Sequence, residues 1–173
     1  AFLGQLKNPY EEVEIGLVGK YNELQDAYKS IHESFIHAGA MNECKVRVRP
    51  IHSESINENN VGEKLADLHG ILVAPGFGER GIEGKIEAIK YVRENNIPVF
   101  GICLGMQCAV VEFGLNVLNL EGAASIEMKA DTPHPIINLM EEQKKITQMG
   151  GTMRLGAYPC EIRRNTKAAS AYK

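Results

Sequence analysis

The chain has 173 residues, 44% of them hydrophobic and 24% charged, which suits one globular domain with a sizeable buried core. The formal net charge is −3 and no long basic run occurs, so the composition gives no support for binding to nucleic acid or to an anionic membrane. The apolar runs around residues 71–75 and 98–104 are far shorter than the roughly 20 residues that span a bilayer. We therefore expect a soluble cytoplasmic protein, or a piece of one.

Apolar strands and amphipathic helices alternate through the first two thirds of the chain. After residues 1–12, which we interpret as the tail of an interdomain linker, strands are predicted at 13–19, 45–51, 70–76 and 97–103, and helices at 22–39, 61–70 and 83–95. Gly39 is expected to end the first of these helices. The all-apolar strands indicate parallel βαβ units. Residues 13–173 are therefore predicted to form a doubly wound α/β domain of flavodoxin-like type, a mostly parallel sheet with helices on both faces.

The regular alternation stops after Leu115. Residues 121–143 suggest loops and a short strand, and residues 150–162 an antiparallel strand or hairpin. The last nine residues show no closing element, although an α/β domain would normally add a further strand there. We therefore expect the domain to be incomplete at its C-terminal end.

The chemistry-bearing cysteine lies where the fourth predicted strand turns into a helix. Four cysteines occur without any C-x-x-C pair, which is typical of reduced thiols and not of a disulfide framework or a metal site: Cys44, Cys103, Cys108 and Cys160. Cys103 stands between Gly101 and Gly105, and strand-Gly-x-Cys-x-Gly-helix is the layout of a nucleophile elbow. The helix that begins at about Leu104 would direct free N–H groups at Cys103 and favour its thiolate form. The Leu104 N–H is also placed to form half of an oxyanion hole. A buried structural cysteine is the alternative.

A glycine-rich loop, Ala74–Gly84, follows the third predicted strand. Its glycines could bind an anion or supply a second oxyanion donor. It lacks the spacing of a Walker loop, and its G-x-G-x-x-G pattern lacks the acidic residue expected about 20 positions later. A plain glycine turn is therefore an equally good interpretation.

No histidine is a convincing general base for the cysteine. His32 and His37 fall on the first predicted helix, while His52 and His69 border loops. His134 lies in an irregular segment between two prolines. A cysteine nucleophile needs a base and a group that orients the base, and this sequence does not supply either one clearly.

The motifs "PGFGERG" and "GICLGMQ" together resemble a class I glutamine amidotransferase domain, in which the G-x-C-x-G cysteine takes ammonia from glutamine. The segments "VGKYNELQDAY", "DTPHPIINLM" and "GGTMRLGAYPC" are similar in particular to the amidotransferase domains of the CTP synthase family, and the match runs from about Pro9 to the end of the chain. The resemblance implies a glutaminase half-reaction with Cys103 as nucleophile and the amides of Gly76 and Leu104 as the oxyanion hole. It also implies a set of glutamine-binding residues: Gly76, Leu104, Gly105, Met106, Gln107 and Glu127.

The same resemblance implies partners outside this chain. Ammonia would pass to an upstream synthetase domain that uses ATP and Mg²⁺ to aminate UTP, with GTP as activator, and the whole protein is expected to be a homo-oligomer. No cofactor is expected in the domain itself. The sequence departs from the family pattern at Pro75, which replaces a glycine and has no N–H to offer. The family's catalytic His-Pro-Glu and arginine-rich segment are expected beyond Lys173, so the fragment itself is predicted to be inactive.

Two other hypotheses remain. The first is a cysteine hydrolase, or an amidotransferase of another pathway such as the GMP or carbamoyl-phosphate type, on the same fold. The second is a non-catalytic flavodoxin-like regulatory module, in which no cysteine would react with a glutamine-like electrophile.

Overall fold

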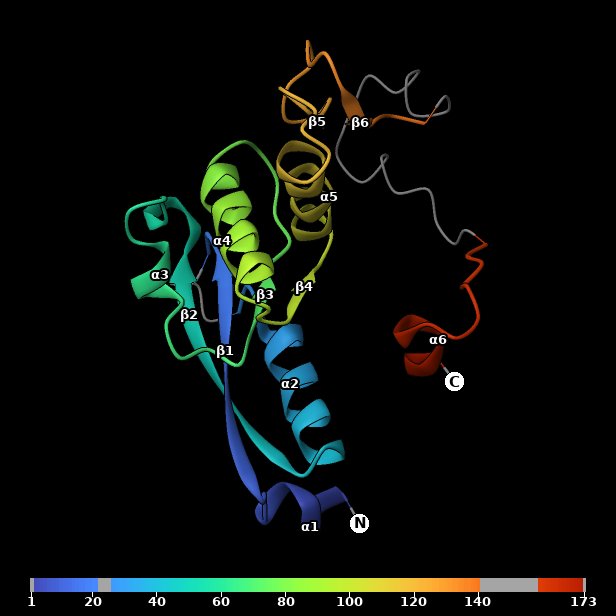
Figure 1. Ribbon diagram of the computed structural model, residues 1–173. Helices are drawn as coiled ribbons and strands as arrows, with labels where there is room; N and C mark the ends of the chain where they lie inside the picture. The colour runs from blue at the N-terminus through green and yellow to red at the C-terminus, as the bar shows by residue number, and fades with distance from the viewer. Residues whose placement is uncertain (1, 22–25, 141–158, 173) are drawn as a thin grey trace. The chain divides into compact units, whose positions relative to one another are not determined.

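The computed structural model describes residues 2–21, 26–140 and 159–172, and the chain divides into two compact units, Ala1–Asn138 and Leu139–Lys173 (Figure 1). The helical segments of the first unit are α1 (Phe2–Lys7), α2 (Lys29–Met41), the 3-10 turn η1 (Ser53–Ser55), α3 (Val61–Lys64), α4 (Ile82–Glu94) and α5 (Leu104–Asn116). Its strands are β1 (Glu11–Gly19), β2 (Cys44–His52), β3 (Gly70–Val73), β4 (Val99–Gly101), β5 (Ala124–Ser125) and β6 (Pro135–Ile137).

The main sheet has four parallel strands in the order β2-β1-β3-β4. Leu17 at the centre of β1 is paired with Pro50 of β2 on one side and with Leu72 of β3 on the other. A parallel order in which β1 lies inside the sheet requires helical crossovers. This confirms the predicted doubly wound α/β architecture.

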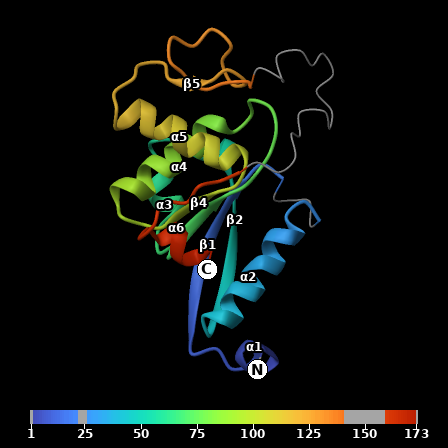
Figure 2. The same cartoon turned by 90° about the vertical axis from the view of Figure 1, so that its right-hand side faces the viewer.

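Helices cover both faces of this sheet, as the two views show (Figure 2). Successive side chains of β1 alternate between the faces, so Leu17 packs with Tyr28 and Ile31 on the α2 side. Val18 belongs to the larger core on the opposite face, which α3, α4 and α5 cover. Both side chains are at most 1% exposed. Burial of one such aliphatic side chain stabilises the fold by about 1.5–3 kcal/mol.

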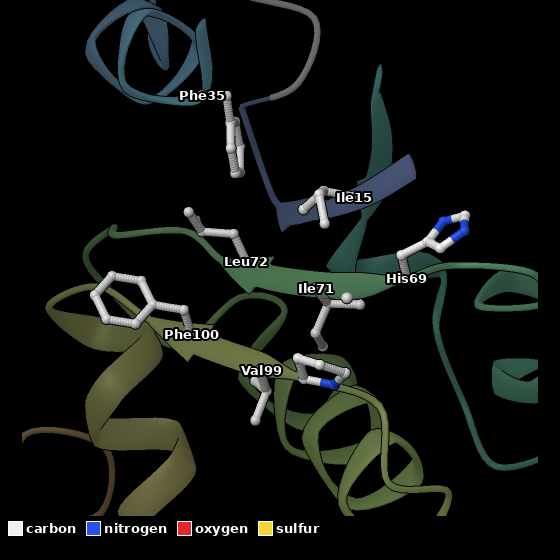
Figure 3. Close-up of a pocket in the computed structure, with 9 residues that line it drawn as sticks. Ile15, Phe35, His69, Ile71, Leu72, Val99 and Phe100 are labelled. Carbon is white, nitrogen blue, oxygen red and sulfur yellow. The ribbon is translucent and has the colours of Figure 1, made fainter. Parts of the chain in front are cut away.

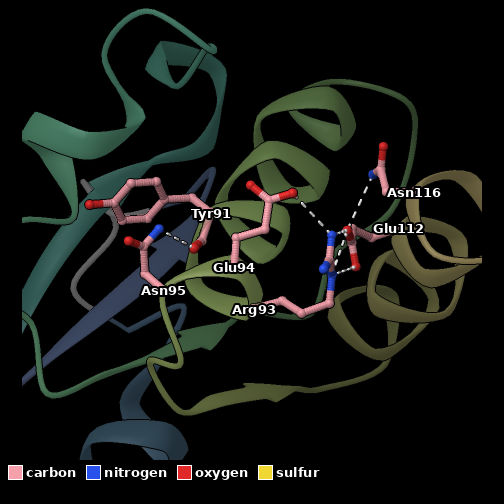
Figure 4. A network of polar contacts seen from close by, with 6 residues as sticks. All are labelled: Tyr91, Arg93, Glu94, Asn95, Glu112 and Asn116. Atoms are coloured by element: carbon pink, nitrogen blue, oxygen red, sulfur yellow. Dashed lines mark hydrogen bonds and ion pairs between the residues drawn. The ribbon is translucent and has the colours of Figure 1, made fainter.

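A polar bridge joins α4 to α5 far from the start of either helix (Figure 4). Arg93 of α4 donates hydrogen bonds of 2.8–3.1 Å to both carboxylate oxygens of Glu112 in α5. Asn116 donates a further hydrogen bond of 3.2 Å to the same carboxylate. Glu112 is only 1% exposed, and a buried carboxylate is tolerated only when it is paired in this way. The bridge therefore fixes how the two helices lie against each other.

The structure corrects two details of the predicted elements. Gly39 does not end α2, which continues to Met41; a Cβ atom at this glycine would lie 2.7 Å from the carbonyl oxygen of Cys44, so the glycine permits close packing on β2. The helix predicted over 61–70 is limited to the four residues of α3. Within the predicted linker tail, residues 2–7 form the short helix α1, and the linker role stays a prediction.

The part of the chain after α5 is less regular, as expected. Strands β5 and β6 form a two-stranded parallel sheet that packs against α5. The predicted hairpin over 150–162 falls mostly on residues outside those that the structure describes, and residues 159–162 form no strand. The end of the second unit does contain an element that was not expected, the helix α6 (Lys167–Ala171), capped by the Thr166 hydroxyl, which accepts a hydrogen bond of 3.1 Å from the Ala169 N–H.

Candidate active site

Cys103 occupies a strained turn between β4 and α5. Its backbone angles are φ 54° and ψ −110°, a conformation that residues with a side chain rarely adopt. The cysteine is the N-cap residue of α5, and its side chain is exposed. Strain at an exposed nucleophilic residue is characteristic of a functional site. The elbow predicted from the sequence is therefore present.

The two flanking glycines are required by close contacts inside this turn. A Cβ atom at Gly101 would lie 2.5 Å from the carbonyl of Gly105. A Cβ atom at Gly105 would collide with the carbonyl oxygen of Val73, at the end of β3. That same carbonyl accepts a hydrogen bond of 3.0 Å from the Ile102 N–H. The end of β3 thus supports the elbow directly.

The start of α5 provides donors beside the cysteine. Leu104 is the first residue of the helix, and the first N–H groups of an α-helix have no acceptor within it. Within this turn the Gly105 N–H donates to the Ile102 carbonyl at 2.9 Å and the Gln107 N–H to the Cys103 carbonyl at 3.1 Å, whereas the described residues offer no backbone acceptor to the Leu104 N–H. The free donors and the helix dipole both favour an anion at this position.

The loop after β3 brings the second proposed oxyanion donor to the same place. A Cβ atom at Gly76 would lie 3.8 Å from the Leu104 side chain, so these two residues, 28 positions apart, adjoin each other. Lys20, which follows β1, donates a hydrogen bond to the Phe77 carbonyl. Lys85 of α4 donates one of 2.8 Å to the Ala74 carbonyl. The loop is therefore held by a lysine on either side of Gly76.

These two lysines were missed in the sequence. Lys20 lies in the segment "VGKYNELQDAY" that carries part of the resemblance, but the sequence pattern assigns it no role. Lys85 lies three residues after Ile82 and four before Ile89, on the buried face of α4, and is fully buried. A lysine at a core position of an amphipathic helix was the signal that could have identified it.

The predicted glutamine-binding residues occupy two places in the fold. Gly105, Met106 and Gln107 lie in the first turn of α5; Met106 is 50% exposed, whereas the Gln107 Oε1 atom is buried without a hydrogen-bond partner among the described residues. A buried acceptor of this kind needs a partner, which a bound ligand can supply. Glu127 follows β5, is exposed, and its N–H donates to the Ser125 hydroxyl at 3.3 Å. No recorded contact joins Glu127 to the elbow within the described residues.

The histidines do not form a catalytic pair with Cys103 in the first unit. Of the five, His32 and His37 lie on α2, His52 ends β2, and His134 precedes β6. The Nδ1 atom of His69 accepts a hydrogen bond of 3.0 Å from the Glu14 N–H. Within the described part of residues 1–138, no hydrogen bond joins Cys103 to a histidine.

Two hollows lie away from the cysteine. The first, of about 290 Å³, is apolar and runs along the edge of the sheet beneath α2 (Figure 3). It is lined by Ile15, Phe35, His69, Gly70, Ile71, Leu72, Pro98, Val99 and Phe100. The second, of about 390 Å³, lies between η1 and the start of α4 and includes Arg80 and Glu83. Neither contains a predicted glutamine-binding residue.

The described residues contain no cluster of His, Cys, Asp and Glu side chains that could hold a metal ion. Across the same residues, no helix combines the length and the apolar character needed to cross a bilayer. The groups gathered around the elbow are therefore a thiol, backbone amides and two ammonium groups. This set can bind a carbonyl oxygen and stabilise negative charge on it.

Known proteins are similar to this chain over most of its length. The sequence model of the family "Glutamine amidotransferase class-I" matches residues 23–172. CTP synthase from Cytophaga hutchinsonii is 65% identical over 171 residues, and that from Flavobacterium johnsoniae is 66% identical; each match covers 99% of this chain. The chain spans about a third, 32%, of the length of these curated relatives.

A solved structure agrees with the sequence relatives. The glutaminase domain of Trypanosoma brucei CTPS, solved with bound acivicin, superposes with a TM-score of 0.69 at 36% identity. The match covers 76% of this chain and 51% of that one. The elbow, the adjoining amides and these relatives lead to one conclusion: the chain belongs to the class-I glutamine amidotransferase family.

Proposed function

We propose that this chain is the glutaminase domain of a CTP synthase and that Cys103 is its nucleophile. The observation that carries the proposal is the strained turn at Cys103, with Leu104 and Gly76 beside it. The bound acivicin of the T. brucei domain and the names of the bacterial relatives support glutamine as the substrate and CTP synthase as the enzyme.

The geometry suits acyl transfer from a carboxamide. The Cys103 thiolate attacks the side-chain carbonyl carbon of glutamine and forms a C–S bond, which moves an electron pair onto the carbonyl oxygen. The Leu104 and Gly76 amides donate to that oxyanion. When the tetrahedral species collapses, the C–N bond breaks and the amine takes up a proton to leave as ammonia. Water then hydrolyses the thioester, releasing glutamate and the free thiol.

The first turn of α5 provides the second part of the substrate site. The buried Gln107 Oε1 atom lacks a partner in the described structure and can accept a hydrogen bond from glutamine. Gly105 and Met106 lie beside it on the same turn. Glu127 is assigned to the α-amino group of glutamine, because a carboxylate is the natural partner of an ammonium group.

The ammonia is used by a separate synthetase domain. A match that spans 32% of the relatives' length supports a larger protein with room for that domain. There ATP and Mg²⁺ would drive the amination of UTP to CTP, with GTP as activator, in a cytoplasmic homo-oligomer. In this proposal Mg²⁺ belongs to the synthetase domain, where it would act together with ATP.

The test is glutamate release from glutamine by the full-length protein that contains this chain. We expect Cys103→Ala to lower kcat roughly 10⁴-fold or more, because the covalent route is lost. Cys160→Ala, which removes the other exposed thiol, is the matched control and should retain activity. Turnover that persists in Cys103→Ala would overturn the assignment.

The product identifies the pathway. With glutamine, ATP and Mg²⁺ supplied, CTP formation from UTP supports a CTP synthase. Amination of xanthosine monophosphate, or formation of carbamoyl phosphate, would instead place the domain in another amidotransferase. If a glutamine-like electrophile labels no cysteine, the regulatory-module hypothesis is favoured.

A further inference from the structure

Lys85 is an ionisable side chain that the proposed reaction leaves without a role. It lies in the first turn and a half of α4, on the face that packs into the main core. It is 0% exposed and is the largest of the fully buried side chains. Burying an ammonium group is strongly unfavourable unless the charge is compensated. Its position therefore calls for an explanation beyond packing.

The side chain of Lys85 reaches the loop that bears Gly76. Its Nζ atom donates to the Ala74 carbonyl at 2.8 Å, while the Ala74 N–H is held by the Val18 carbonyl at 2.9 Å. Ala74 is therefore fixed on both sides of its Cα atom. The Ala74 carbonyl and the Gly76 N–H belong to successive peptide groups, and the proline ring of Pro75 fixes φ between them, so holding this carbonyl restricts the directions open to the Gly76 N–H.

The ammonium also faces Gly76 itself. A Cβ atom at Gly76 would lie 3.9 Å from the Lys85 Nζ atom and 3.3 Å from the Lys20 Cε atom. Lys20 binds the Phe77 carbonyl on the other side of the glycine. Two positive groups therefore approach the loop segment that carries the proposed oxyanion donor.

No carboxylate compensates this charge in the part of the chain that the structure describes. The recorded ion pairs involve other lysines and arginines, and none includes Lys85. Burial lowers the pKa of Lys85, the charges of Cys108 and Cys103 act to raise it, and Lys20 acts to lower it. Gly76, which faces the Lys85 ammonium, also adjoins Leu104, the residue after Cys103, so the exposed Cys103 thiol lies in the neighbourhood of this charge.

We propose that Lys85 is a positioning residue of the glutaminase site. Its ammonium fixes the Ala74 carbonyl so that the Gly76 N–H and the Leu104 N–H can donate to the same oxyanion. Its positive charge stabilises the negative charge of the Cys103 thiolate. The proposal rests on the proposed function for the reaction itself. The coupling between Lys85 and Cys103 does not depend on glutamine turnover and can be measured separately.

The experiment compares three variants of the full-length protein by two measurements. Lys85→Met removes the charge and the donor while keeping a side chain of similar length, and Lys85→Gln keeps a donor without the charge. Lys90→Met, on the partly exposed side of the same helix, is the control. The first measurement is the pH profile of Cys103 alkylation by neutral iodoacetamide, followed by peptide mass spectrometry. The second is kcat and KM for glutamine.

We expect the midpoint of the alkylation profile to move upward by about one pH unit in Lys85→Met and Lys85→Gln, because a nearby cation is lost. We expect kcat to fall roughly tenfold or more while KM changes less than about threefold. The variants lose stabilisation of the oxyanion, whose negative charge develops only during the reaction and is absent when glutamine first binds. Lys90→Met should match the parent in both measurements. If Lys85→Met does not fold, Lys85→Gln gives the same comparison.

Failure of this inference is distinct from failure of the proposed function. If the parent hydrolyses glutamine and both Lys85 variants keep the parental alkylation profile and kcat, Lys85 serves only the core and the inference is wrong. If the parent releases no glutamate, the proposed function fails, and the alkylation profile still decides whether Lys85 acts on Cys103. A shift of equal size in Lys90→Met would also overturn the inference, because the effect would then be general.

Discussion

The turns that follow β3 and β4 lie side by side in one sheet, and each contributes one amide to the proposed oxyanion hole, yet they are held in different ways. The turn after β4 is shaped by backbone contact: Gly101 packs on Gly105, and Gly105 on the end of β3. The turn after β3 is held by long side chains, because Lys85 and Lys20 bind carbonyls on either side of Gly76. The conformation of the turn after β4 depends on steric contact, whereas that of the turn after β3 depends on charged side chains.

The difference has a physical reason. A nucleophile must keep one geometry, and contact between backbone atoms is the stiffest means of fixing it because neither partner can rotate away. An oxyanion donor also needs positive potential, which glycines do not supply and ammonium groups do. The two turns should therefore respond differently to added volume and to pH.

The largest expected effect is on the turn shaped by contact. Gly105→Ala should lower the free energy of unfolding by about 3 kcal/mol, because its methyl group would collide with the Val73 carbonyl, which is backbone and cannot move aside. Urea denaturation measures the change. Gly76→Ala is the matched variant in the other turn. Its methyl group would lie 3.3 Å from the flexible end of Lys20 and at ordinary van der Waals distance from the Leu104 and Lys85 side chains, so stability should stay within about 0.5 kcal/mol of the parent. Equal losses in the two variants would refute the contrast between the turns.

A smaller effect is the pH dependence of stability that the buried Cys108 thiol of α5 causes. Burial raises the pKa of Cys108 from 9.0 to about 11. Between these values the unfolded chain has released the thiol proton and the folded chain has kept it, so stability falls as pH rises from about 9 to 11. The loss from this group is on the order of 2 kcal/mol.

Cys108→Ala isolates that loss. The stability advantage of the parent over the variant should shrink across this pH range, as measured by urea denaturation at each pH. Lys85 has the opposite sign, because its lowered pKa means that stability is regained as pH rises toward 10.5, but Lys85 is present in both proteins. A constant difference between parent and variant from pH 8 to 11 would contradict the assignment to Cys108.

The smallest expected effect is an increase in stability. Cys103→Gly should raise the free energy of unfolding by about 1 kcal/mol, because glycine adopts φ 54° without the strain that the cysteine side chain imposes. The variant should release no glutamate. Cys103→Ala is the control, since it removes the thiol and keeps the strain, and should not gain stability. A destabilised Cys103→Gly would show that the turn is not strained.

The sheet and the elbow could be predicted from the sequence because short stretches of consecutive residues identify both. All-apolar strands and the G-x-C-x-G spacing need no knowledge of distant residues, and Cys103 lies where that spacing placed it. Gly39 was wrongly taken as a helix end because its actual role, packing on Cys44, depends on a tertiary contact. Lys85 was missed for a related reason: whether a lysine is buried depends on which elements cover it, and its partner carbonyl lies 11 residues away in the loop after β3.

The support that β3 gives to the elbow has a consequence for folding. The bond from Ile102 and the contact of Gly105 both end on the Val73 carbonyl, so the strained turn cannot persist until β3 and β4 have paired. The nucleophile therefore acquires its geometry only once these two strands have paired, although the sequence pattern that marks it is local. An intermediate in which β4 has detached would keep most of the core and lose its reactive thiol geometry first.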